Sequence, residues 1–235
     1  MICFAFPLAH EAKGLLKDCV QKDTFSIGQL HCTLGNLGER SVLIAQVGMG
    51  QTLAEENTRA IFHHFRPRAF ILAGYGGALS PQLKLGQIIM SANYTSEEVV
   101  PFLRLLSGFD FAGFCTSDEL AATKEKRDEY ARSSHHHVIE METAAVADVV
   151  RARSIPFIAL RVISDDYQQV LPARALAAGF NVQKGRATPF RLLGHLATHP
   201  GDIAPFRKFV SGLAPARRNL TNFLQQLNTE LPHGW

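Results

Sequence analysis

The chain has 235 residues, of which 46% are hydrophobic and 19% are charged, and its formal net charge is +3. This length supports one sizeable core, so we predict a single domain over residues 1–235. The small net charge argues against a nucleic-acid partner. No apolar run reaches the roughly 18 residues that cross a bilayer, and the first seven residues lack the basic start of a secretory signal. We therefore predict a cytoplasmic protein.

The cysteines and histidines do not form a metal-binding pattern. The cysteines are widely spaced and contain no CxxC pair, which is typical of reduced, buried thiols. The consecutive histidines at 135–137 point apart on either a strand or a helix, so they cannot share one ion. The sequence therefore predicts no metal site.

The amino-terminal part predicts strands and one short helix. Residues 2–6 are apolar throughout, as in a buried strand, and a helix is expected over 10–19. Glu11 lies at the start of that helix, where the macrodipole stabilises an acid. Two strands, over 25–34 and 41–47, are expected to form a hairpin.

Two glycine clusters follow strands. Gly48-Met49-Gly50 precedes a helix that is expected to begin at a capping box, Thr52–Glu55, and to end near Phe65. Such glycines let backbone N–H groups approach an anion or a ribose, or they form only a tight turn.

The second cluster, Gly74-Tyr75-Gly76-Gly77, is the densest in the chain and follows an apolar strand over 68–73. A dinucleotide fingerprint would need a small residue where Leu79 stands and a helix directly afterwards, and Ser80-Pro81 is a poor helix start. A Rossmann nucleotide-binding site is therefore not predicted. A short strand is expected over 87–92, and the charged stretch 124–132 is expected to be an exposed helix.

Carboxylates lie at both ends of the unit 138–166. Glu140-Met141-Glu142 opens it, an Ala-rich helix over 142–153 and an apolar strand over 157–163 follow, and Ser164-Asp165 closes it. Ligands of open α/β sheets bind outside the carboxyl ends of the strands, so this Ser-Asp pair is a candidate site, unless it is only a polar turn.

Residues 183–235 predict a helical C-terminal extension. Helices are expected over 189–199, 202–213 and 216–228. The stretch 184–218 contains many Lys and Arg residues, one acid and several Phe and Leu residues. It is either a solvated helical face or a peripheral contact with an anionic membrane.

These motifs carry a family resemblance. Glu140-Met141-Glu142, Arg161-Val162-Ile163-Ser164-Asp165 and the Gly74–Gly77 cluster resemble the nucleoside phosphorylase and nucleosidase superfamily (purine and uridine phosphorylase family 1), which includes methylthioadenosine/adenosylhomocysteine nucleosidases. The region from 190 to 224 is more similar to the hopanoid-associated phosphorylase branch. The resemblance implies a three-layer α/β/α fold with a mixed central sheet, a homodimer, and a small nucleoside substrate that is lipid-linked in that branch.

The resemblance also implies roles for single residues. Asp165, oriented by Ser164, would protonate the departing purine, and Glu11 would orient the attacking water. Glu142 would bind the ribose hydroxyls, with Met141 packed beneath the sugar. The substrate-binding residues implied in this way are Gly48, Gly74, Tyr75, Gly76, Gly77, Glu140, Met141 and Glu142. Tyr75 departs from the family pattern, because the nucleosidases carry a Ser there.

Three functions remain open. A nucleosidase that hydrolyses a 5′-substituted adenosine and releases adenine would need no cofactor, whereas a phosphorylase would need phosphate and cationic side chains to bind it. The resembled phosphorylases carry Arg in two places that read Leu8-Ala9-His10 and Ile71-Leu72-Ala73 here, which favours hydrolysis, although Arg59 or Arg161 would serve if it turned inward. The third function is a nucleoside-binding protein that has lost the chemistry.

Overall fold

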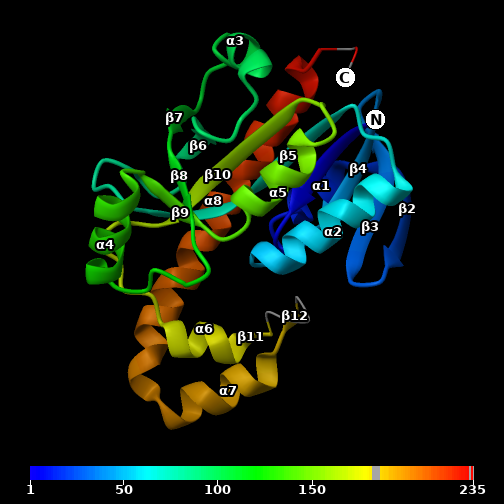
Figure 1. The fold of residues 1–235 in the computed structure, drawn as a ribbon. Coiled ribbons are helices and arrows are strands. Elements are labelled where there is room, and N and C mark those ends of the chain that lie inside the picture. The colour runs from blue at the N-terminus through cyan, green and yellow to red at the C-terminus, as the bar shows by residue number, and fades with distance from the viewer. Residues whose placement is uncertain (182–185, 233, 235) are drawn as a thin grey trace.

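The computed structural model describes residues 1–181, 186–232 and 234. A ten-stranded mixed sheet forms its centre (Figure 1). Its strands are β1 (Ile2–Phe6), β2 (Val20–Ile27), β3 (Leu30–Leu37), β4 (Arg40–Gln46), β5 (Ala69–Ala78), β6 (Ile88–Ser91), β7 (Asp110–Ala112), β8 (Phe114–Thr116), β9 (Val138–Glu140) and β10 (Phe157–Asp165). The main order is β2-β3-β4-β1-β5-β10-β6-β7, and β9 pairs with β5 and β8. Strands β4, β1, β5 and β10 are mutually parallel.

Helices cover both faces of the sheet. They are α1 (Lys13–Asp18), α2 (Gln51–His64), α3 (Val100–Leu103), α4 (Lys124–Ser134), α5 (Thr143–Arg151), α6 (Ala173–Gly179), α7 (Pro189–Thr198) and α8 (Ile203–Glu230), with short 3-10 turns at Glu97–Val99 and Pro200–Asp202. Because side chains alternate along a strand, Phe4 packs into the apolar cluster that holds α1 and α8, and Ala5 packs into the cluster that holds α2 and α5. The predicted three-layer α/β/α fold with a mixed sheet is confirmed.

The expected strand over 25–34 is wrong. It divides at Gly28, whose φ of 59° suits a tight turn that glycine adopts without strain. The two halves belong to β2 and β3, which pair in an antiparallel hairpin. A second hairpin then joins β3 to β4 at Gly38.

Three expectations about helix ends and breaks are also corrected. Helix α1 begins at Lys13, later than expected, so Glu11 lies in the turn before it. Helix α2 begins after Gly50 without a side-chain cap, so the capping box does not form. The two helices expected on either side of Pro215 are one, because α8 continues through this residue.

The Gly-rich cluster lies inside a strand, whereas it was expected to follow one that ended at residue 73. Gly74–Gly77 continue strand β5, which pairs with β10 along its length. A side chain at Gly76 would lie 2.8 Å from Val138 and 3.1 Å from Arg161, so these glycines allow close packing inside the sheet.

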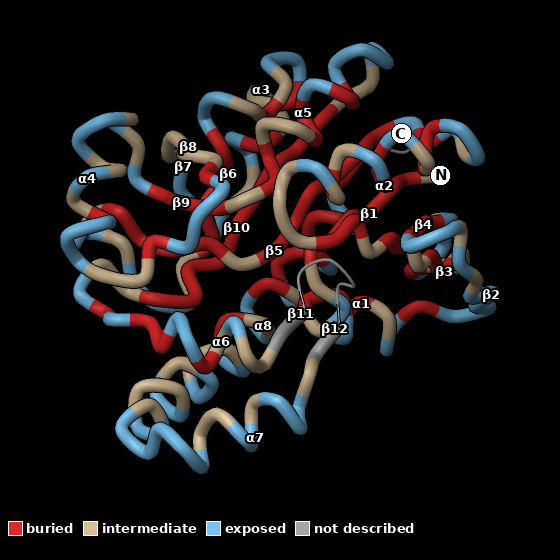
Figure 2. Tube along the Cα trace, turned by 60° about the horizontal axis from the view of Figure 1, so that its bottom comes forward, coloured by how far each residue is buried: buried red, intermediate tan, exposed pale blue. Residues whose placement is uncertain are grey.

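Helices α6, α7 and the first turns of α8 form a lobe that projects from the three layers (Figure 1). Within it, the short strands β11 (Phe180–Asn181) and β12 (Arg186–Ala187) pair with each other. The expected boundary at residue 183 lies outside the described residues. Helix α7 contains no buried residue, as its tan and pale-blue colouring in Figure 2 shows. Among the described residues, no helix is both long enough and apolar enough to cross a membrane.

Candidate active site

A pocket lies at the carboxyl ends of β1, β5 and β10. Its cavity volume is about 150 Å³. The residues that line it are Pro7, Leu8, Glu11, Met49, Tyr75, Gly76, Gly77, Glu119, Leu120, Ala121, Ile139, Glu140, Met141, Glu142, Ser164, Asp165, Leu171, Leu176 and Phe209. The topology therefore brings together side chains that are far apart in the sequence, as expected for an α/β sheet.

A β-bulge shapes the wall formed by Ser164 and Asp165. Ile163 pairs with Gly76 and Asp165 pairs with Gly77, so Ser164 is the extra residue of the bulged strand. In a regular strand, neighbouring side chains point to opposite faces, whereas both of these residues line the pocket. The Ser164 hydroxyl donates a hydrogen bond of 2.6 Å to Asp165 Oδ1.

Arg127 contacts the pocket residue Asp165 from behind, and sequence reasoning missed it. Helix α4 was expected to be exposed, but the Arg127 side chain is completely buried and forms an ion pair with Asp165 Oδ2. Its second terminal nitrogen donates to the carbonyl of Ala78 at 3.0 Å. The surrounding helix is largely polar, and Tyr130 and Ala131, three and four residues after Arg127, are the weak signal of a buried face that was available.

Glu11 forms the opposite wall. Its side chain is buried, and its two oxygens accept backbone N–H groups from Tyr75 at 2.8 Å and from Leu8 at 2.7 Å. Burial raises the pKa of this carboxyl to about 8, in spite of the two donors, which lower it. A carboxyl with such a pKa is a far better proton acceptor than an exposed glutamate once it is ionised.

Glu142 lies where β9 passes into α5. The Gly50 N–H donates to its Oε1 at 2.9 Å, and Arg161 reaches its Oε2 at 3.3 Å. Burial raises the pKa of Glu142 to about 7, although the Arg161 guanidinium opposes this change. Its two oxygens have few partners, which leaves acceptor capacity for a ligand.

Glu140 has a different environment. Its Oε2 accepts from Arg161 at 2.6 Å and from the Glu142 N–H. The same oxygen also accepts from the hydroxyl and the N–H of Thr143. Its Oε1 contacts the Thr116 hydroxyl. This carboxylate is saturated by the protein, so it anchors the chain before α5 although it borders the pocket.

Only some of the glycines that were predicted to bind substrate lie in the pocket. Gly76 and Gly77 line the pocket, but Gly48 and Gly74 are not among its lining residues. A side chain at Gly74 would lie 3.0 Å from Glu11 Oε1, so this glycine makes room for the carboxyl group. The Tyr75 side chain borders the pocket, and its hydroxyl is 3.5 Å from the carbonyl of Leu213 in α8.

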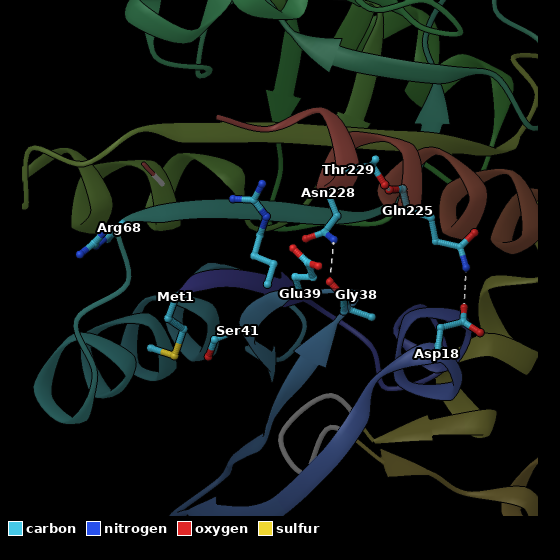
Figure 3. Close-up of a pocket in the computed structure, with 11 residues that line it drawn as sticks. Met1, Asp18, Gly38, Glu39, Ser41, Arg68, Gln225, Asn228 and Thr229 are labelled. Atoms are coloured by element: carbon cyan, nitrogen blue, oxygen red, sulfur yellow. Dashed lines mark hydrogen bonds between the residues drawn. The ribbon is translucent and has the colours of Figure 1, made fainter. Parts of the chain in front are cut away.

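A larger hollow of about 770 Å³ opens at the opposite, amino-terminal edge of the parallel strands (Figure 3). It is bordered by Met1, by the turn around Gly38 and by the end of α8, where Asn228 donates to the carbonyl of Leu37. None of the predicted site residues lines it.

The cysteines are free, as predicted, and Cys3, Cys19 and Cys32 are buried. Within the described part of the chain, no group of three or more His, Cys, Asp or Glu residues is arranged to hold a metal ion.

Three solved structures share this fold at low sequence identity. Futalosine hydrolase of Helicobacter pylori strain 26695, solved as a mutant, has a TM-score of 0.75 and 15% identity, covering 98% of this chain and 99% of that one. The 5′-methylthioadenosine/S-adenosylhomocysteine nucleosidase of Neisseria meningitidis, in complex with methylthio-immucillin-A, has a TM-score of 0.73 and 16% identity over 98% and 99%. The nucleosidase of Colwellia psychrerythraea 34H, in complex with adenine, has a TM-score of 0.64 and 17% identity over 71% and 83%.

A family model described as the Phosphorylase superfamily matches residues 2–112 and 112–197. The match spans most of the chain and includes the segments that carry Glu11, the Gly-rich strand, Glu142 and Asp165. The expectation of an enzyme of the nucleosidase or nucleoside phosphorylase class is thereby confirmed. This chain belongs to the phosphorylase superfamily.

Proposed function

We propose that this protein is a nucleosidase, which hydrolyses the N-glycosidic bond of a 5′-substituted adenosine and releases adenine. The observation that carries the proposal is the convergence of three buried carboxyl groups, Glu11, Glu142 and Asp165, on one pocket from three separate parts of the chain. Breaking this bond places positive charge on the ribose and negative charge on the base, so acids at separate positions assist both ends at once.

The proposed reaction is a hydrolysis at C1′ of the ribose. The bond between C1′ and N9 breaks, and a water oxygen forms the new bond to C1′. Glu11 accepts a proton from that water, and Asp165 delivers a proton to the purine, for which N7 is the receptor position. Glu142 binds the ribose hydroxyls through its free acceptor positions, and Met141 packs beneath the sugar. Electrostatic stabilisation of the sugar cation by Glu142 completes the step.

Hydrolysis rather than phosphorolysis is supported by the charge of the pocket. Among the described residues, its lining contains Glu and Asp side chains but no Arg, Lys or His. Arg161 is buried behind Glu140 and Glu142 and is paired with both, and Arg59 pairs with Glu55 on the exposed side of α2. A phosphate dianion in this pocket would meet carboxylates without a facing cation.

The 5′-substituent is proposed to be apolar and extended, with a lipid as one such group. Leu171, Leu176 and Phe209 give the pocket an apolar wall on the side of the α6–α8 lobe. The lobe continues outward to Phe190, which is 87% exposed, and Leu193, which is 64% exposed. These residues and the exposed Arg191 support contact with an anionic membrane surface, from which such a substrate would enter. The similarity to the hopanoid-associated branch and the homodimer stay predictions.

Adenine release tests this function. Adenosines that carry no 5′-group, a methylthio group, a homocysteinyl group or an alkyl chain are incubated with the enzyme, with and without phosphate, and free adenine is quantified. We expect release without phosphate, with a sugar product that keeps its 5′-group and carries a free anomeric hydroxyl, and a loss of about 100-fold or more in Asp165→Asn. Release that requires phosphate would identify a phosphorylase. Binding without release from any of these compounds would identify a nucleoside-binding protein.

A further inference from the structure

Arg127 is the nearest cation to Asp165, yet it does not line the pocket. Its guanidinium lies behind Asp165, where it bridges the carboxyl group on β10 and the carbonyl of Ala78 on β5. Gly77 permits this approach, since a side chain there would lie 2.8 Å from Asp165 Oδ2 and 3.2 Å from Arg127 Nη1. Arg127 therefore contacts the pocket only through Asp165.

Stability alone does not explain this arrangement. A buried ion pair is often no more stabilising than an apolar pair of similar size. Arg127 also leaves its Nε–H without a hydrogen-bond partner in the described structure, which carries a further cost. Helix α4 already has a second attachment to the chain after β10, because the Tyr167 hydroxyl contacts Asp128.

The hydrogen-bonding geometry distinguishes the two oxygens of Asp165. A guanidinium donates but cannot accept, so Oδ2 is fixed as an acceptor by Arg127. Oδ1 accepts from the Ser164 hydroxyl when Asp165 is ionised, and this hydroxyl is able to accept in turn when Oδ1 carries a proton. The unprotonated oxygen of a neutral carboxyl group is the better acceptor for a guanidinium, so the contact with Arg127 favours Oδ1 as the oxygen that carries the proton.

We propose that Arg127 is a positioning residue for the reaction, which fixes the Asp165 carboxyl group so that Oδ1 presents its proton to the departing base. The inference rests on the proposed nucleosidase function and adds to it a residue outside the pocket. The other ionisable groups around the pocket are Glu11, Tyr75, Glu119, Glu140, Glu142 and Arg161. None of them replaces this contact, because Oδ2 of Asp165 accepts from Arg127 alone among the described side chains.

The test is a double-mutant cycle with two substrates. Arg127→Met, Asp165→Asn and the double variant are compared for base release from a 5′-substituted adenosine and from a 4-nitrophenyl riboside, whose phenolate leaves without protonation. We expect Arg127→Met to lower kcat for adenine release by about 100-fold, the usual effect of misplacing a reacting group by about 1 Å. We expect little change in KM, a small change with the nitrophenyl riboside, and partial recovery of kcat in Arg127→Lys.

The double variant separates positioning from damage to the fold. If Arg127 acts through Asp165, Arg127→Met should have almost no further effect in the Asp165→Asn background. The matched control is Arg132→Met, which removes an exposed arginine from the same helix and should leave both activities unchanged. The double variant also leaves no buried charge unpaired, so it remains informative if Arg127→Met is poorly folded.

If the wild type is active, two results would overturn the inference. The first is that the kcat losses of Arg127→Met and Asp165→Asn add in the double variant, and the second is that Arg127→Met lowers kcat equally for both substrates. A wild type that releases no base from any nucleoside would instead overturn the proposed function, and the inference with it.

Discussion

Glu11 joins the turn after β1 to the Gly-rich end of β5, because its Oε1 accepts the backbone N–H of Tyr75 at 2.8 Å. Burial of the carboxyl group outweighs this donor and raises its pKa to about 8. At pH 7 most molecules therefore carry a protonated Glu11, and the fraction able to accept a proton grows as the pH rises.

The first prediction concerns the pH dependence of activity. Since Glu11 must be ionised to accept a proton from water, its ionisation should give the kcat/KM profile an acidic limb that rises with pH up to about 8. Glu11→Gln should lower kcat/KM by about 100-fold or more and remove this rise. Adenine release between pH 5 and 9 measures both effects. Glu56→Gln, an exposed glutamate on α2, is the control and should retain the wild-type profile. A rise that persists in Glu11→Gln would assign the titration to another group.

The second prediction separates Glu140 from its neighbour Glu142. Glu140 pairs with the buried Arg161 and accepts hydrogen bonds from Thr143, so Glu140→Gln should lower the free energy of unfolding by about 3–5 kcal/mol. Glu142→Gln should lower kcat/KM while costing less stability, because Glu142 accepts fewer hydrogen bonds. Urea denaturation and adenine release measure the two quantities. An equal loss of stability in both variants would contradict the anchoring role of Glu140.

The third prediction uses the raised pKa of Glu142, which is about 7 instead of 4.5. Below pH 4.5 the carboxyl is neutral in the folded and unfolded states. As the pH rises towards 7, the unfolded chain ionises while the folded protein keeps the proton, so stability is lost. The free energy of unfolding of the wild type, minus that of Glu142→Gln, should therefore fall from about pH 4.5 to about 7 and then level off. A difference that grows over this interval would show that the folded state favours the ionised carboxyl.

Strong local patterns made much of the fold predictable. Strand β1 begins and ends as expected, and the α5–β10 unit has the predicted order, because a continuous apolar run and an Ala-rich helix need no distant partner to be recognised. The sequence also indicated that Ser164 and Asp165 follow the apolar run of β10, at the edge of the sheet where Glu142 returns to the pocket.

The features that sequence reasoning missed are set by contacts between residues that are far apart in the chain. Arg127 lies in a largely polar stretch of sequence, and its burial follows from contacts with Asp165 of β10 and Ala78 of β5, which are distant in the chain. Pro215 is tolerated inside α8 although local rules end a helix there. The expected strand ended at residue 73 because glycine has low strand propensity, whereas β5 continues through Gly74–Gly77, where close packing inside the sheet requires the absence of side chains.

The fourth prediction concerns Gly77. A Cβ at this position would lie 2.8 Å from Asp165 Oδ2, closer than real contacts allow, so Gly77→Ala should displace the carboxyl group and lower kcat by at least about tenfold. Gly194→Ala is the matched control, since its Cβ would meet no atom within 4 Å and it lies in helix α7. There alanine should raise the free energy of unfolding by about 0.5–1 kcal/mol. Full activity in Gly77→Ala would contradict the prediction, because it would show that displacing the Asp165 carboxyl group does not lower kcat.

The last prediction tests the exposed apolar face of α7. Phe190 and Leu193 are 87% and 64% exposed, and the basic Arg191 lies between them. Burying one such side chain in a membrane interface contributes about 1.5–3 kcal/mol, so Phe190→Glu and Leu193→Glu should each lower vesicle affinity by about tenfold or more.

Cosedimentation with phosphatidylglycerol–phosphatidylcholine vesicles measures this affinity, and vesicles of phosphatidylcholine alone report the electrostatic contribution. Leu105→Glu is the control, because this leucine is 83% exposed but follows α3, far from the lobe (Figure 1). Binding should fall with rising salt, since the Arg191 charge is screened. If Phe190→Glu and Leu193→Glu bind vesicles as tightly as the wild type and the Leu105→Glu control, α7 does not contact the membrane. The same conclusion follows if the wild type does not bind. A substrate with an apolar 5′-group would then have to reach the pocket from solution.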